Sequence, residues 1–302
     1  MDLALLLEPS VLAEVLVQGL VRGAMYALMA AGLAVIFGIL GVANFAHGAL
    51  FMLGSYAMVL VGIDLGLPFA AGIAAAVLVL FAVGFALERT VIETLRRRAG
   101  RDWLLDSFVL TIGLMVVLEN LALIAFGSRR RGISQLIDGS LELGRAIISY
   151  ERLFILVAAA AAGAALWAGM RYSAFGKALR ATAQNPEAAQ TLGIDIARIY
   201  SYSFGLGAAL AGLAGALLIS IYPAYPTVGY QPVVKGLAVV ILGGLGHVPG
   251  AVIGGLVLGV VEAYSLLFMA SGWQNVVTAG LVVLVLILRP SGLFVAAGGD
   301  RP

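Results

Sequence analysis

The sequence has no cysteine, which excludes disulfide bonds, thiolate metal sites and cysteine nucleophiles. Charge is also scarce: 11% of the residues are Asp, Glu, Lys or Arg, whereas soluble domains carry about 25%. The opening segment MDLALLLEPS has neither a basic n-region nor a small-residue cleavage site, so we expect no cleaved signal peptide. With so little charge and 62% hydrophobic residues, the chain is predicted to be an integral membrane protein.

Long apolar runs occupy most of the chain. Runs of roughly 17 to 25 apolar residues can cross a bilayer as helices, and the short alternating pattern of an outer-membrane barrel is missing here. We predict an all-α polytopic membrane protein, one transmembrane domain over residues 1–302, with about eight transmembrane helices and an upper bound of about ten. The candidate segments are 21–40, 42–63, 68–87, 108–126, 153–170, 202–221, 236–264 and 276–288.

One of these segments is too long for a single pass. Segment 236–264 has 29 residues, whereas a straight span needs about 20. Arg289 favours a cytoplasmic C-terminal end, but eight simple crossings would leave that end opposite to its expected side. We therefore expect the long segment to be broken into two passes or a re-entrant pair.

Three polar connections join the apolar segments, at about 88–103, 127–152 and 171–199. The first and third are separated by two spans, so they should share one face of the membrane, with the second opposite. Basic residues do not decide which face is cytoplasmic, because all three connections contain several of them.

Two apolar segments are interrupted at corresponding places in the two halves of the chain. The stretches GVANFAHGALF and LGGLGHVPGAV hold the two histidines of the sequence. Matching interrupted helices are typical of transporters built from two related halves, where unwound backbone lines a binding site or pathway; packed, kinked helices are the alternative. The candidate pathway or helix-break residues are Asn44, Phe45, His47, Gly48, Gly243, Gly244, His247 and Pro249.

Glycines recur at a spacing of four in the second half. Gly246, Gly250 and Gly254 form one series, and Gly255 and Gly259 form another. Small residues at this spacing let helix backbones approach closely in lipid. We therefore interpret these glycines as a packing surface and not as substrate contacts.

The stretch RATAQNPEAAQTLGI predicts a short capped helix over residues 186–192. Asn185 is a favoured N-cap, Pro186 suits the first helical position, and Glu187 complements the positive end of the helix dipole. Gly193 supplies a left-handed stop. About two helical turns are unstable alone in water, so other parts of the protein must brace this helix.

This helix carries small side chains at helical spacing. Ala188, Ala189 and Leu192 are expected to form one small apolar face, with Arg180 beside it. Such a face fits a groove in a partner protein. A helix lying on lipid headgroups is the alternative, but it would need larger apolar side chains.

The stretch GKALRATAQNPEAAQTLGI resembles the cytoplasmic coupling loop of ABC importer permeases. Together with GAMYALMAAGLAVIFGILGVANFAHGALFMLGSY, GGLGHVPGAVIGGLVLGVVEA and LRPSGLF, it makes the chain similar to the branched-chain amino acid permease family. The resemblance implies that loop 171–199 is cytoplasmic and loop 127–152 extracytoplasmic. It also implies ATPase-coupling positions at Arg180, Asn185, Pro186, Glu187, Ala188, Ala189, Leu192 and Gly193.

The resemblance further implies a multi-pass protein of the bacterial inner membrane and its partners. These are a homologous permease subunit, expected as a heterodimer, two cytoplasmic ABC ATPases and a periplasmic or extracellular substrate-binding protein. The expected function is ATP-driven import of branched-chain or similar hydrophobic amino acids. A permease for urea or short amides is the alternative within the family.

Motifs for catalysis are missing. There is no G-x-x-x-x-G-K-[ST] phosphate loop, so ATP and Mg²⁺ are expected on partner subunits, with no cofactor or metal bound by this chain. An intramembrane enzyme is disfavoured because G-x-S-x-G and H-E-x-x-H are both missing. A proton-coupled transporter is a further alternative, with Glu119, Glu262 and the histidines as candidate carriers. We favour the interpretation that Glu119 and Asn120 hold neighbouring helices by hydrogen bonds.

Overall fold

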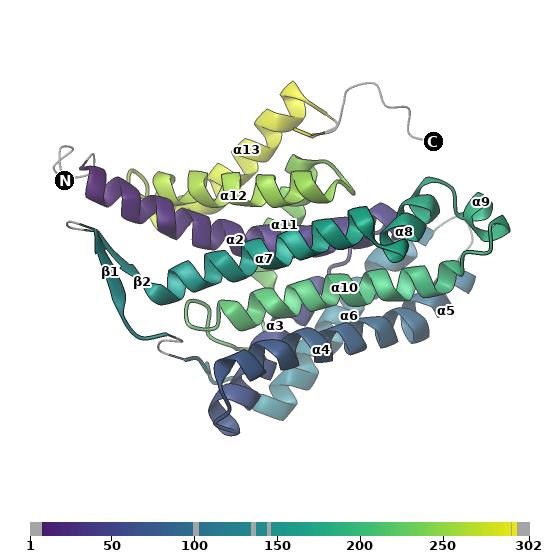
Figure 1. The fold of residues 1–302 in the computed structure, drawn as a ribbon, viewed down its shortest axis with the longest axis horizontal. Coiled ribbons are helices and arrows are strands. Elements are labelled where there is room, and N and C mark those ends of the chain that lie inside the picture. The colour runs from purple at the N-terminus through teal and green to yellow at the C-terminus, as the bar shows by residue number, and fades with distance from the viewer. Residues whose placement is uncertain (1–7, 99–102, 134–136, 144–145, 291, 295–302) are drawn as a thin grey trace.

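The computed structural model describes residues 8–98, 103–133, 137–143, 146–290 and 292–294 (Figure 1). Residues 1–7, which bear on the expectation about a signal peptide, lie outside this set. The membrane-type helices are α2 (Pro9–Leu40), α3 (His47–Met58), α4 (Phe69–Leu87), α6 (Trp103–Phe126), α7 (Tyr150–Tyr172), α10 (Ile196–Leu217), α11 (Tyr230–Gly243), α12 (Val248–Ser265) and α13 (Gln274–Leu288). The shorter elements are η1 (Val59–Asp64), η2 (Glu88–Ile92), α5 (Glu93–Arg98), β1 (Ser140–Leu143), β2 (Ala146–Ser149), α8 (Ala174–Gln184), α9 (Pro186–Thr191) and η3 (Ser271–Trp273).

Seven helical segments of the described chain are long and apolar enough to cross a membrane, and α11 and α13 are shorter apolar helices. The all-α polytopic prediction is therefore confirmed. The list of eight segments is wrong at one place, because segment 236–264 is two helices, α11 and α12, separated at Gly244–His247. The suspected break is confirmed, and α13 leaves the bundle at a slant after α12 (Figure 1).

The polar connections gather at two opposite ends of the molecule (Figure 1). Helices α5, α8 and α9 lie at one end, and β1, β2 and the start of α2 lie at the other. The first and third connections therefore share an end, as counting of crossings predicted.

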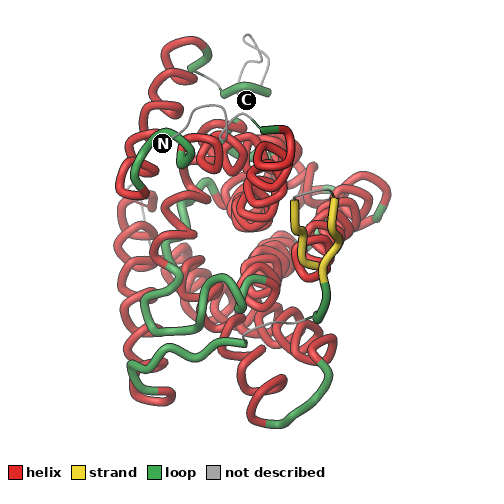
Figure 2. Tube along the Cα trace, turned by 90° about the vertical axis from the view of Figure 1, so that its left-hand side faces the viewer, coloured by secondary structure: helices red, strands yellow, loops and turns green. Residues whose placement is uncertain are grey.

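Two of these connections contain more regular structure than expected. The first is largely helical, because α4 continues through η2 and α5 as one segment, Phe69–Arg98. The second contains an antiparallel hairpin in which Ser140 pairs with Ser149. Viewed from the end that carries this hairpin, one group of helices runs along the line of sight and another runs across the view (Figure 2).

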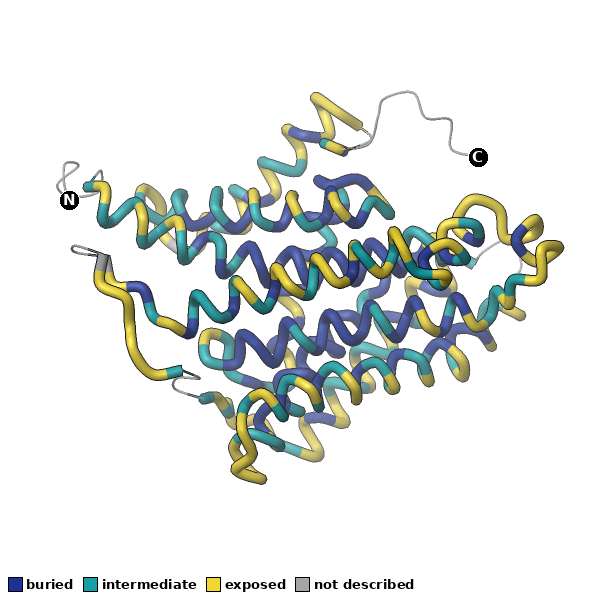
Figure 3. The backbone as a smooth tube through the Cα atoms, in the orientation of Figure 1, coloured by how far each residue is buried: buried dark blue, intermediate teal, exposed yellow. Residues whose placement is uncertain are grey.

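Helices α2 and α10 form the interior of the bundle. In the most apolar 18-residue window of each, 83% and 78% of the residues are buried, against 11% in α6 and in α7 (Figure 3). A membrane helix that is apolar but exposed must contact lipid or another subunit. Helices α6 and α7 therefore lie on the outside of this chain.

Glycines set the distance between α2 and α12. A Cβ atom at Gly255 would overlap the backbone of Ala27, and one at Gly259 would overlap Gly23. The packing interpretation is thus confirmed for this pair of glycines. The other series is mixed: a Cβ atom at Gly250 would overlap the carbonyl of Gly243, whereas Gly254 has only ordinary van der Waals neighbours and Gly246 lies before the helix with a φ of +81°.

Candidate functional site

The capped helix predicted from the sequence is α9, at one end of the molecule (Figure 1). The Asn185 side chain accepts a hydrogen bond from the backbone N–H of Ala188 at 3.0 Å. At the other end, Gly193 has a φ of +81°, and the N–H of Ile194 donates to the carbonyl of Ala189 at 3.1 Å. The helix ends at Thr191, one residue earlier than predicted.

The expected single apolar face of α9 is divided. Ala188 is exposed and Leu192 is 80% exposed, but Ala189 is buried within its own chain. Ala189 therefore braces the helix and is not available to a partner, which corrects that assignment. Glu187, Ala188 and Leu192 remain on the outer surface.

A second helix, α8, precedes α9 and was not predicted. The Ser173 side chain caps it by accepting from the N–H of Gly176 at 2.9 Å. The Arg180 guanidinium donates to the carbonyl of Met170, in the last turn of α7. Arg180 thus ties α8 to α7, and α8 and α9 together form a polar helical hairpin between α7 and α10.

The hairpin faces helix α5 across a groove of about 420 Å³. The groove lies between Glu93 and Arg97 on α5 and Gln190 and Asp195 near α9. Both edges of this groove carry polar side chains, and it opens at the same end of the molecule as α9.

Beneath the groove, a buried carboxylate links α5 to α10. Glu88 accepts hydrogen bonds from Arg96 at 2.8 Å and from the hydroxyl of Ser201. The Arg96 guanidinium lies 4.3 Å from the centre of the Tyr200 ring. This link was not predicted from the sequence, where its signal is a lone glutamate at the end of an apolar run.

The first interruption, residues 41–46, joins α2 to α3. It begins at Gly41, with a φ of +68°, and α3 begins at His47, which is fully buried. Asn44 is buried as well, and neither of its side-chain polar atoms has a hydrogen-bond partner in the described structure. The Phe45 ring makes an edge contact with Phe108 of α6, with centroids 4.9 Å apart.

Close packing surrounds the start of α3. A Cβ atom at Gly48 would overlap the carbonyl of Gly229, just before α11, and His47 packs against Gly32 of α2. His47, one of the candidate pathway or helix-break residues, therefore lies in the protein interior. Gly48 is required by this crossing of two backbones.

The second interruption begins at Gly244, with a φ of +100°, and ends at His247. His247 caps α12, because its Nδ1 accepts from the N–H of Gly250 at 3.0 Å. His247, one of the candidate helix-break residues, therefore fixes the start of α12 through its own side chain. Gly243 is the last residue of α11, and Pro249 lies in the first turn of α12.

His247 and Pro249 also line a cavity of about 620 Å³ between α2, α7, α8 and the second interruption. Its polar side chains are Arg171, Arg180 and His247. The C-terminal stretch packs behind the same break, where the N–H of Leu293 donates to the carbonyl of Leu242 at 2.9 Å.

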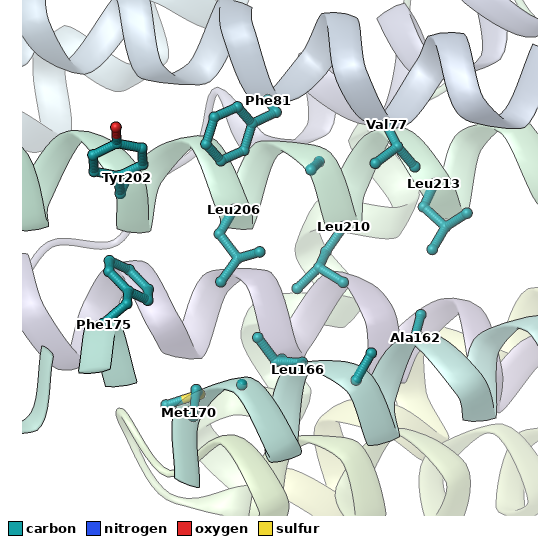
Figure 4. Close-up of a pocket in the computed structure, with 13 residues that line it drawn as sticks. Val77, Phe81, Ala162, Leu166, Met170, Phe175, Tyr202, Leu206, Leu210 and Leu213 are labelled. Atoms are coloured by element: carbon teal, nitrogen blue, oxygen red, sulfur yellow. The ribbon is translucent and has the colours of Figure 1, made fainter. Parts of the chain in front are cut away.

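An apolar cavity of about 440 Å³ separates α7 from α4 and α10 (Figure 4). Leu166 of α7 faces Leu206 and Leu210 of α10 across it. Phe81 of α4 and Phe175 of α8 also line the cavity. Almost all of the lining is apolar.

A buried ionic network joins four helices. Lys235 of α11 donates to Glu262 of α12 and, at 2.5 Å, to Thr278 of α13. Tyr26 of α2 donates to the other Glu262 oxygen at 2.7 Å. Glu262 was singled out as a candidate proton carrier, whereas Lys235 was missed. Its signal is a lone charge in the apolar run QPVVKGLAVV, since such a charge needs a partner.

The expectation for α6 is wrong in part. Asn120 is exposed, and its side chain donates to the carbonyl of Val116 in its own helix at 2.8 Å. Glu119 is half-buried and makes no hydrogen bond within the described residues. Neither side chain holds a neighbouring helix of this chain.

Comparisons with known proteins cover nearly the whole chain. Residues 15–286 match the family described as "Branched-chain amino acid transport system / permease component". The high-affinity branched-chain amino acid transport system permease protein LivH of Escherichia coli K12 is 35% identical over 289 residues, covering 91% of this chain and 92% of LivH. BraD of Pseudomonas aeruginosa, with the same description, is 34% identical over 292 residues, covering 92% and 94% of the two chains.

A more distant similarity covers part of the chain. The ribose import permease protein RbsC of Bacillus subtilis is 32% identical over 130 residues, covering 41% of this chain and 40% of RbsC. No solved structure gives a significant match.

Proposed function

Because this chain belongs to the family of branched-chain amino acid transport permeases, we propose that it is the membrane-spanning subunit of an ATP-driven importer for branched-chain or similar hydrophobic amino acids. The assignment of the substrate rests on relatives that match about nine-tenths of the chain and whose names include branched-chain amino acid transport. They argue against a urea or short-amide permease and against a proton-coupled transporter. The proposed location is the bacterial inner membrane.

The observation that carries the ATP-driven mechanism is α9, a capped helix at the end of the molecule with Glu187, Ala188 and Leu192 exposed. A short helix with a small apolar surface fits a groove in another protein. We assign α9 and α8 as the docking site of an ATPase subunit, which places this end in the cytoplasm. ATP and Mg²⁺ are then bound by the ATPase, and a binding protein delivers substrate at the opposite end.

The contacts around the hairpin suggest how motion reaches the bundle. A push on α9 passes to α7 through Arg180 and to α10 through the short link at Asp195, whose side chain caps α10. Helix α7 borders the apolar cavity, so it can move as a rigid body. Such shifts of packed helices are common in alternating-access changes.

The two interruptions are the proposed substrate route. Unwound backbone and a buried amide without a partner are tolerated at membrane depth where they line a cavity or meet a polar ligand. Asn44 and the stretch up to Gly48 provide this in the first half, and Gly244 to His247 provide it beside the 620 Å³ cavity in the second.

Transport by the reconstituted importer tests the function. Proteoliposomes that contain this chain, its paired permease, the ATPases and the binding protein should accumulate leucine only when ATP is supplied on the side of the membrane that carries the ATPases. Leucine should compete with labelled isoleucine or valine, and urea should not. Uptake driven by a proton gradient without ATP or partner subunits would refute the proposal, and binding of urea by the solute receptor would refute the substrate.

Reversal of charge on α9 is expected to uncouple the ATPase. Glu187→Lys places a positive charge at the positive end of a helix dipole and on the proposed docking surface, so ATPase co-purification and ATP-dependent uptake should fall at least about tenfold, which corresponds to about 1.4 kcal/mol. Glu187 is exposed, so the folded yield of the permease should not change. Co-purification and uptake assays measure both effects.

The matched control is Glu142→Lys, which reverses an exposed charge on β1 at the opposite end. It should leave ATPase binding intact. If Glu187→Lys and the wild type bound the ATPase equally well, the assignment of α9 to the docking site would be wrong.

A further inference from the structure

Helix α6 presents a broad face to the outside of its own chain. Its buried residues are Ser107, Thr111 and Ala122. On the opposite side, Val109, Val117 and Ile124 are 68%, 53% and 82% exposed. An apolar face of this length must be covered by lipid or by another membrane helix.

The same helix carries two polar side chains that lipid does not suit. Glu119 and Asn120 lie about 10 Å inside the end of the helix at Phe126, at a rise of 1.5 Å per residue. Glu119 has no hydrogen-bond or ion-pair partner within the described chain, and Asn120 is bonded only to Val116 of its own helix. The carboxylate and the amide oxygen therefore both lack a donor.

The bilayer cannot supply that donor. A charged side chain near the centre of a membrane helix costs about 2.5–3.5 kcal/mol on insertion scales, and such residues face a bundle interior, a watery cavity or a partner. Helix α7 provides the comparison, since it is equally exposed but has no charged or amide side chain between 153 and 170. The face of α7 suits lipid, whereas the face of α6 requires a polar neighbour.

We propose that the outer face of α6 is the seam with the paired permease subunit, and that an amide, hydroxyl or basic side chain of that subunit donates to Glu119 within the bilayer. The inference rests on the proposed function, which supplies a second permease. It adds which helix meets that subunit and the chemistry of the contact. Val116 and Leu123 lie on the same side of the helix as Glu119 and are 47% and 42% exposed. A Cβ atom at the nearby Gly113 would have no neighbour within 4 Å, so a partner helix can approach closely.

Photocross-linking in native membranes tests the seam. The complete importer is expressed with different tags on the two permeases, and p-benzoylphenylalanine is placed at position 116 or 123 of α6, or at position 157 or 161 of α7 as the matched control. Both α6 positions should give an adduct with the paired permease. Neither α7 position should do so, although Val157 is 68% exposed.

Substitution of Glu119 tests the polar contact. Glu119→Leu should reduce the adduct from position 116 about threefold or more, in line with interhelical hydrogen bonds in bilayers, whereas Glu119→Gln should retain most of it. Leucine favours membrane insertion over glutamate, so a loss of pairing is not explained by failed insertion. The folded yield of the single subunit, measured by size exclusion, should be unchanged or higher.

Several results would overturn the inference: adducts from α7 in place of α6, adducts with a second copy of this chain, adducts with lipid alone, or pairing unaffected by Glu119→Leu. If any of these occurs while the ATPases co-purify and leucine is transported, the seam is wrong and the proposed function stands. If neither a second permease nor an ATPase accompanies the chain, both fail.

Discussion

Replacement of Glu262 by leucine is expected to lower the free energy of unfolding by about 3–5 kcal/mol, the usual effect of removing one partner of a buried ion pair. Lys235 would be left buried with the hydroxyl of Thr278 as its remaining partner. Tyr26 would also lose its acceptor. Equilibrium unfolding in mixed micelles with sodium dodecyl sulfate measures the change, and the folded yield should fall with it.

The double variant Lys235→Met with Glu262→Leu is the control. A buried pair replaced by apolar side chains of similar volume is often neutral or stabilising by about 1–4 kcal/mol, so most of the lost stability should return. Thr278 keeps a partner in the double variant, because its hydroxyl also donates to the carbonyl of Gln274 at 3.0 Å. If Glu262→Leu alone were as stable as wild type, the network would not hold α13 to the bundle.

Replacement of Gly259 by leucine is expected to separate α2 from α12 and to lower the free energy of unfolding by at least about 3 kcal/mol, at the upper end for overpacked sites. A Cβ atom there would overlap the backbone N and Cα of Gly23, and backbone atoms of two long helices cannot move aside locally. The same micelle titration and the monodisperse fraction after detergent extraction measure the loss.

Gly280→Leu is the matched control for that variant. Gly280 is also a glycine inside an apolar helix, α13, but a Cβ atom there would have no neighbour within 4 Å. Leucine is a better helix former than glycine, by somewhat less than the about 0.8–1 kcal/mol that separates glycine from alanine, so stability should be unchanged or slightly higher. Equal losses in the two variants would mean that glycine acts through helix propensity and not through packing.

The capped helix α9 shows how far local sequence can predict structure. Asn185, Pro186 and Gly193 act through their own backbone and the nearest N–H groups, so their spacing fixes the helix almost to its ends. The direction of Ala189 could not be predicted in this way. Helical spacing groups it with Leu192, but the neighbouring chain decides which side of a two-turn helix is covered.

For the interrupted helices, too, the local sequence predicts one part of the structure and the tertiary structure decides the other. Glycine and proline predicted the break at Gly244–His247, because they remove or loosen local backbone hydrogen bonds. The partner of each glycine across a helix pair, such as Gly48 against Gly229, depends on residues far apart in the chain. No local pattern specifies that pairing.

The sequence by itself determined the class of the protein, its apolar segments, the two interruptions and the capped polar helix, because hydrophobic length, glycine and proline act over a few residues. Tertiary structure alone decided that Lys235, Glu262, Thr278 and Tyr26 meet, and that Glu119 lies half-buried beside the exposed face of α6. A charged residue in an apolar segment indicates that a partner is needed. It does not indicate which residue is the partner, because the partner depends on how helices far apart in the sequence pack together.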